Sequence, residues 1–131
     1  MTTAVDLLAA INTHLAEFEL PPIASVQVVA ATTAPQGTVQ LVCHDLGNTA
    51  RGLLAWADTL TQVTAQAWRV TAGDSVHLSV TGRLAGGASV LVYGGLWAQH
   101  RGLGADLAPG ATTPIPLTIL RHAATIQEAR A

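Results

Sequence analysis

The sequence contains no lysine and few charged residues of either sign. Only 11% of its 131 residues are charged, whereas a typical globular chain has about 25%. The six basic residues are all arginines that occur singly, so no basic run is present to neutralise phosphates. The net charge of −2 has the wrong sign for attracting a polyanion. Nucleic-acid binding driven by electrostatics is therefore not expected.

The sequence also has little cysteine and no long apolar run, and its first residues do not have the pattern of a signal peptide. The single cysteine, Cys43, excludes an intramolecular disulfide and a cysteine-based zinc motif. The first residues carry no positive side chain, and Asp6 interrupts their short apolar stretch, so no signal peptide is expected. No apolar run approaches the roughly 18 residues of a membrane span. We therefore predict a soluble, cytoplasmic protein that does not bind membranes.

Hydrophobic residues, in contrast, are abundant. They make up 50% of the chain, which is enough for one core at a length typical of one domain. We therefore predict a single α+β domain spanning residues 1–131. The low charge also suggests that a second copy of the chain covers part of its surface, so we expect self-association.

The N-terminal segment, residues 3–18, has the period of an amphipathic helix. Thr3 followed by Asp6 resembles a capping box. Pro21 and Pro22 end the helix, because proline cannot continue the hydrogen-bond ladder. The residues expected on its buried face are Leu8, Ile11, Leu15 and Phe18.

Two further helices are predicted. One covers residues 48–60, where Asn48 is a suitable N-cap because its side chain can accept a hydrogen bond from a free amide. The other begins near Pro116, since proline is favoured in the first turn of a helix.

Five segments alternate between apolar and polar residues, as strands do. Residues 26–30 and 39–43 are separated by a turn at 34–37, which predicts a hairpin. Three more strands, 62–71, 75–84 and 88–93, form an antiparallel meander between about Gln62 and Trp97, because short glycine-containing turns connect them. Residues 98–114 are expected to be a long surface loop.

The predicted order is α-β-β-α-β-β-β-α. Short turns favour a mostly antiparallel sheet, and helices that cover one face of such a sheet give a two-layer α+β sandwich. The order of the strands in the sheet is left open.

The sequence from Leu53 to Leu96 contains LLAWADTL, VHLSVTGRL and VYGG, and is followed by GADL and by PL and LR. These motifs resemble small uncharacterised actinobacterial proteins that are associated with mobile elements and phage-derived islands. The resemblance covers about the last two-thirds of the chain. It implies no particular activity, and it favours an accessory bacterial protein over a metabolic enzyme.

Reactive side chains occur together at two places, but neither has the pattern of a known site. Cys43 and His44 precede Asp45, yet neighbouring strand residues point to opposite faces, which separates a potential Cys–His pair. His100 lies near Asp106 in a glycine-rich loop, without an associated nucleophile. The five histidines include no H-x-x-x-H pair. We therefore assign no catalytic, cofactor-binding or metal-binding residue, and expect no cofactor.

The meander nevertheless predicts a working surface. If Val76, Leu78 and Val80 face the helices, the side chains between them face the other way. Gln27 and Gln40 of the first hairpin are expected on this side too. Aromatic residues and arginine are typical of interaction hot spots. The candidate interaction residues on this face are Gln66, Trp68, His77, Arg83, Leu91 and Tyr93.

Three functions are consistent with these features. The first is a non-enzymatic protein-interaction module that forms a homodimer or binds another protein through this face. The second is a single-stranded nucleic-acid binder that stacks bases on Trp68, His77 and Tyr93. The third is a small enzyme that uses His44 or His100 with a carboxylate. The sequence favours the first and does not identify a process or partner.

Overall fold

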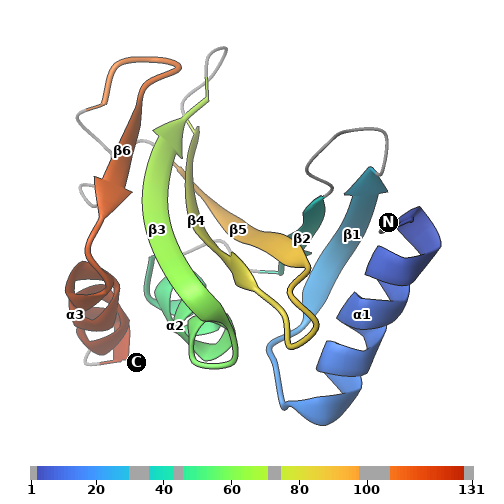
Figure 1. Ribbon diagram of the computed structural model, residues 1–131. Helices are drawn as coiled ribbons and strands as arrows, with labels where there is room; N and C mark the ends of the chain where they lie inside the picture. Colours follow the sequence, from blue (N-terminus) through green and yellow to red (C-terminus); the bar gives the residue numbers. More distant parts are fainter. Residues whose placement is uncertain (1–2, 30–35, 43–45, 71–74, 98–106, 129–131) are drawn as a thin grey trace.

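The computed structural model of the chain describes residues 3–29, 36–42, 46–70, 75–97 and 107–128. These residues form three helices and six strands (Figure 1). In chain order they are α1 (Ala4–Glu17), β1 (Ile23–Val29), β2 (Gln36–Leu41), α2 (Leu46–Ala57), β3 (Thr61–Arg69), β4 (Ser75–Arg83), β5 (Ser89–Trp97), β6 (Thr112–Ile115) and α3 (Leu117–Glu128). The predicted α+β class is confirmed.

The strands form one sheet in the order β1-β2-β5-β4-β3-β6. The predicted hairpin is the antiparallel pair β1–β2, and the predicted meander is β3–β4–β5. These two units are joined by a parallel pairing of β2 with β5. The sheet is therefore mixed, with one parallel pair among its otherwise antiparallel strands.

The strand β6 corrects the prediction of a loop over residues 98–114. Thr112–Ile115 pairs antiparallel with β3 and forms one edge of the sheet. Pro114 lies inside this four-residue strand, and a proline there hides the strand pattern in the sequence. Proline is tolerated at a sheet edge because a missing N–H there breaks no ladder hydrogen bond.

The helices cover one face of the sheet, as predicted. α1 packs on β1 and β2, α2 packs on β4 and β5, and α3 packs along α2 (Figure 1). On the helix-facing side of the meander, Val76, Leu78 and Val80 are fully buried. Trp56 and Leu53 of α2 fill the space opposite them. The alternation in β3, β4 and β5 therefore identified the core face correctly.

Two glycines allow the helices to approach the sheet closely. A Cβ atom added to Gly94 on β5 would lie 2.8 Å from Thr49 Cγ2 on α2. A Cβ added to Gly37 on β2 would lie 2.5 Å from Ile11 Cδ1 on α1. Both distances are far shorter than ordinary carbon–carbon contacts, so a side chain at either position would require Ile11 or Thr49 to shift.

The N-terminus of α1 carries the predicted capping box. The Asp6 amide donates to Thr3 Oγ1 at 3.0 Å, and the Thr3 amide donates to Asp6 Oδ2 at 3.1 Å. Hydrogen bonding to Thr3, chiefly from its backbone amide to the carboxylate, holds the pKa of Asp6 below its usual value. The cap satisfies two amides that lack partners within the helix.

The buried face of α1 differs from the predicted one. Leu7, Ile11 and His14 are buried, whereas Leu8 and Phe18 are exposed. Both sets have helical spacing, and the hydrophobic pattern favoured the wrong set because the true one includes a histidine. The prediction for Leu8 and Phe18 is therefore wrong.

His14 is accommodated in the core by specific contacts. Its ring stacks on Trp56 with 5.4 Å between centroids and lies 4.7 Å from the ring of Phe18. His14 Nε2 lies 2.7 Å from Thr59 Oγ1, and the Thr59 hydroxyl lies 2.8 Å from the Trp56 carbonyl, to which it donates. Since the hydroxyl proton is used there, His14 Nε2 is the donor to Thr59. This side chain joins α1 to the end of α2.

The second helix begins at Leu46, so the prediction that Asn48 is its N-cap is wrong. Asn48 instead lies in the first turn, where its Oδ1 accepts a hydrogen bond from the Arg51 guanidinium. Arg51 also donates to the Ala124 carbonyl of α3 at 2.9 Å. The prediction that the last helix begins near Pro116 is confirmed, because α3 starts at Leu117.

None of the helices in the described part of the chain is both long and apolar enough to cross a membrane.

Candidate functional site

The face of the sheet opposite the helices carries the predicted surface residues. The register places Gln66 beside Ser79, Ser79 beside Tyr93, and Tyr93 beside Gln40. Residues that pair directly across strands point to the same face. This row therefore runs across four strands on the open side, and Gln40 lies on it as predicted. Gln27 also faces this side, because it pairs with Thr38 in the next row.

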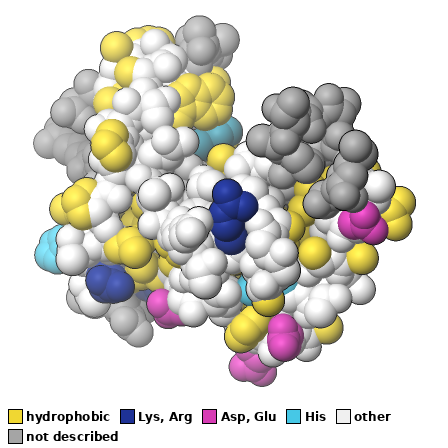
Figure 2. Space-filling model, in the orientation of Figure 1, with side chains coloured by type: hydrophobic (Ala, Val, Ile, Leu, Met, Phe, Trp, Pro, Cys, Tyr) yellow, Lys and Arg dark blue, Asp and Glu magenta, His cyan; other side chains and the backbone are white. Residues whose placement is uncertain are grey.

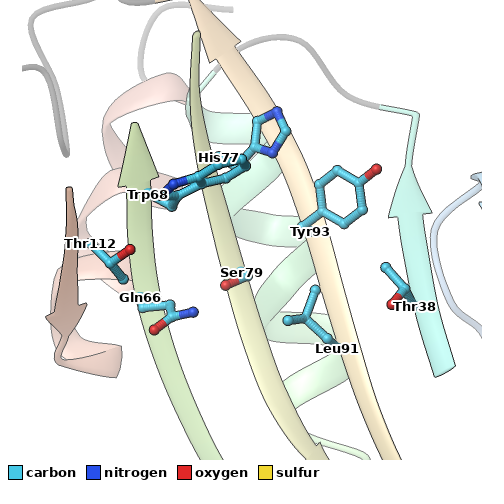
Figure 3. Close-up of a pocket in the computed structure, with 8 residues that line it drawn as sticks. All are labelled: Thr38, Gln66, Trp68, His77, Ser79, Leu91, Tyr93 and Thr112. Atoms are coloured by element: carbon cyan, nitrogen blue, oxygen red, sulfur yellow. The ribbon is translucent and has the colours of Figure 1, made fainter. Parts of the chain in front are cut away.

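A cavity of about 460 Å³ is open on this face (Figure 3). Five of the six predicted surface residues line it, the exception being Arg83. Figure 2 shows hydrophobic and histidine side chains side by side in the upper part of the molecule, with a basic side chain lower down near the centre of the view. The lining residues are Thr38, Gln66, Trp68, His77, Ser79, Leu91, Tyr93 and Thr112.

Three rings from three neighbouring strands form an aromatic ledge, defined as Trp68, His77 and Tyr93. Trp68 meets His77 edge to face, with centroids 5.2 Å apart and planes at 76°. His77 stacks on Tyr93 at 5.1 Å and 26°. Gly95, the residue paired with His77 on β5, has no side chain to occupy the space beside the imidazole. The rings therefore support one another along one side of the cavity.

The floor of the cavity lies beside the ledge. Figure 3 shows Ser79 between Gln66 and Leu91, with Thr112 and Thr38 on the two flanking strands β6 and β2. The Ser79 side chain is buried, whereas Gln66 and Leu91 are partly exposed. Among the described residues, Gln66 and Ser79 have no side-chain hydrogen-bond partner. Their polar groups are therefore available to a bound group.

The described lining of the cavity is electrically neutral. None of these eight residues is an acid, a lysine or an arginine. Burial lowers the pKa of His77 below its ordinary value, because desolvation disfavours the charged imidazolium. The ring is therefore neutral at neutral pH. The site can offer apolar surface and uncharged hydrogen-bonding groups, but no counter-ion.

Arg83 lies on the same face but away from the cavity. It pairs with Ser89 near the far ends of β4 and β5. Its guanidinium donates to Gln62 Oε1 at 3.0 Å and to the Gly87 carbonyl at 2.8 Å. Arg83 thus links the start of β3 to the turn between β4 and β5 instead of contributing to the ledge.

Other sequence-based candidates lie outside the described residues. These are Cys43, His44, Asp45, His100 and Asp106. Within the described ranges, no group of three His, Cys, Asp or Glu residues is arranged to hold a metal ion.

Three lining residues are not among the six candidates predicted from the sequence. One is Ser79, although its alternation with Val76, Leu78 and Val80 already indicates this face. Thr112 was placed in a loop, because the β6 strand was not recognised. Thr38 joins the site only because β2 pairs with β5, and the sequence left that strand order open. The alternation in residues 39–43 predicts that Gln40 faces this side, but it does not extend to Thr38.

No protein-family model matches the chain, and comparisons with curated proteins and with solved structures also give no match. The resemblance to actinobacterial mobile-element proteins therefore stays a prediction.

Proposed function

We propose that the protein is a non-enzymatic interaction module that binds an uncharged side chain of a partner protein in the open-face cavity. The observation that carries this proposal is the aromatic ledge beside a neutral cavity. Trp68 is 36% exposed at its rim, although burying such a side chain would be strongly favourable. A partner side chain that is apolar or aromatic would cover it.

The cavity favours binding over catalysis. Nucleophilic catalysis by serine needs a base within hydrogen-bond reach. His77 and Ser79 share the cavity, but within the described residues His77 makes no hydrogen bond to Ser79 or to a carboxylate. The arrangement therefore offers contact surface without an activated group.

The shape and charge of the face also favour a protein partner that is not a copy of this chain. Two copies facing each other would oppose two hollows and leave both unfilled. A single-stranded nucleic acid would need cations near its phosphates. None is among the described residues that line the cavity, and Arg83, which lies on this face, is engaged by Gln62 and Gly87.

The proposal is tested with blocked amino acids as probes, followed by NMR of the protein. N-acetyl-tryptophanamide and N-acetyl-leucinamide are expected to bind in the millimolar range, shifting the Trp68 indole and the Leu91 methyl signals. N-acetyl-glutamate amide, which is charged, is expected to leave them unchanged. Trp68→Ala should weaken binding roughly tenfold, which corresponds to about 1.4 kcal/mol.

Ile119→Ala serves as the matched control, because Ile119 is an exposed hydrophobic residue on α3, away from the cavity. It should bind the probes as the unchanged protein does. If neither uncharged probe shifts Trp68 or Leu91, the proposed site is wrong. If a short oligothymidylate shifts them instead, with a steep dependence on salt, the nucleic-acid hypothesis replaces this one.

A further inference from the structure

The two edges of the sheet differ in how well they are protected from further pairing. The β6 edge is four residues long and contains Pro114. The β1 edge, Ile23–Val29, is seven residues long, with no proline and no charged residue. Natural proteins usually block free edges with charges, prolines or short strands. Within β1 the register is interrupted between Ile23 and Ser25, which leaves Ser25–Val29 regular.

An apolar groove lies beside this edge on the helix side of the sheet. Its volume is about 300 Å³, and it is lined by Ala4, Val5 and Leu8 of α1 together with Val26 and Val28 of β1. Val5 is 76% exposed and Leu8 is 52% exposed. Figure 1 shows α1 running alongside β1 at this end of the sheet. The free backbone of β1 and the groove therefore form one continuous surface.

The charge of this surface and the direction of its edge strand both allow it to pair with a second copy of itself. All five groove residues and all of β1 are uncharged, so these residues place no like charges opposite one another in a pair of copies. A twofold axis perpendicular to an edge strand places that strand antiparallel to its own copy, which is a geometry that permits regular pairing. The exposed side chains of one α1 would then lie over the groove of the other copy.

We propose that this surface binds a second copy of the chain. β1 pairs antiparallel with the β1 strand of the partner, joining the two sheets edge to edge. Val5 and Leu8 are covered at the same time. The interface is at the small end for specific complexes, below about 1,200 Å², so we expect a dimer of micromolar affinity. The open-face cavity stays free, and the inference does not depend on the function proposed for it.

The test is sedimentation equilibrium of the full chain over a concentration range centred on about 1 µM, with Leu8→Lys as the diagnostic variant. Lysine is well tolerated in helices, and position 8 is half exposed, so the variant should fold. We expect at least a tenfold weaker dimer. Ile119→Lys is the control, because it places the same charge at a similarly exposed hydrophobic position on α3, and it should leave the dimer unchanged.

Amide hydrogen exchange then locates the contact. The amides of the Ser25–Val29 segment that face away from β2 should become protected as the concentration rises. Val5→Lys, at a more exposed position, should remove this protection if Leu8→Lys disturbs folding. A monomer at all concentrations, a dimer insensitive to both lysines, or unprotected β1 amides would each overturn the inference. A dimer broken only by Trp68→Asp would assign the interface to the open face instead.

Discussion

Leu78 and Leu91 are the same type of residue on neighbouring strands, but they point to opposite faces of the sheet. Leu78 is fully buried beneath α2, whereas Leu91 is partly exposed in the cavity. The comparison extends along the meander, where Val76, Leu78 and Val80 alternate with His77 and the other residues of β4. One strand thus contributes stability through one face and a candidate binding surface through the other.

Truncating the two leucines should separate these roles most strongly. Leu78→Ala leaves a cavity in a filled core and should lower the free energy of unfolding by about 2–5 kcal/mol. Leu91→Ala removes a partly solvated side chain and should cost much less. Urea denaturation of both variants measures the difference. Equal losses would mean that the open face is as tightly packed as the core.

Gly94 and Gly95 are adjacent on β5 and face opposite sides of the sheet, so they provide a second comparison of the two faces. Gly94→Ala would place a methyl group 2.8 Å from Thr49 Cγ2, and such overpacking should cost about 1–3 kcal/mol. Gly95→Ala would place it 3.6 Å from the nearest atom of the His77 ring, an ordinary contact. We therefore expect thermal denaturation to show a clear loss for Gly94→Ala and little change for Gly95→Ala.

The cause of the Gly94→Ala loss can be checked with Thr49→Ser. Serine lacks the Cγ2 atom that makes the closest contact and keeps Oγ1, which is 3.4 Å away. The double variant should recover part of the lost stability, giving a coupling between neighbours. Strictly additive effects would contradict a direct clash.

The smallest expected effect is a dependence of stability on pH, which two histidines should cause. Burial lowers the pKa of His14, with Glu17 opposing the shift, and burial also lowers that of His77. The unfolded chain therefore binds protons at pH values where the folded chain does not. Stability should be complete above about pH 6.5 and fall as the pH drops below it, by at most about 1.4 kcal/mol per pH unit for each histidine.

NMR titration of the two imidazoles and denaturation at several pH values measure this effect. His14→Gln and His77→Gln should each reduce the fall in stability between pH 7 and 5. If either histidine titrates above about 6.5, its environment favours the charged ring and the sign for that residue is reversed.

Much of the candidate site could be predicted because it depends on strand alternation. A strand with Val76, Leu78 and Val80 on one face must place His77 and Ser79 on the other. Short turns then bring Trp68 and Tyr93 beside His77 on neighbouring strands. These relations are local in sequence, so they need no knowledge of the complete sheet.

The parts that were missed depend on distant contacts or on a residue of unusual type. The pairing of β2 with β5, which brings Thr38 to the cavity, is not encoded within either strand. Pro114 gives the sequence of β6 the pattern of a loop. His14 hides the buried face of α1 from the hydrophobic pattern, because a histidine stabilised by Thr59 and Trp56 replaces the expected hydrophobic residue.

The parallel junction between β2 and β5 has a consequence for folding kinetics. Gln36 and Ser89, which pair there and also share a hydrogen bond of 3.2 Å between their side chains, are 53 positions apart in the chain. The hairpin and the meander on either side close much shorter loops. Because non-local strand pairs form slowly, we expect these two units to assemble first and the junction last. Until then the hairpin and the meander each expose an inner strand edge. We therefore expect misassembly to be most frequent before β2 pairs with β5.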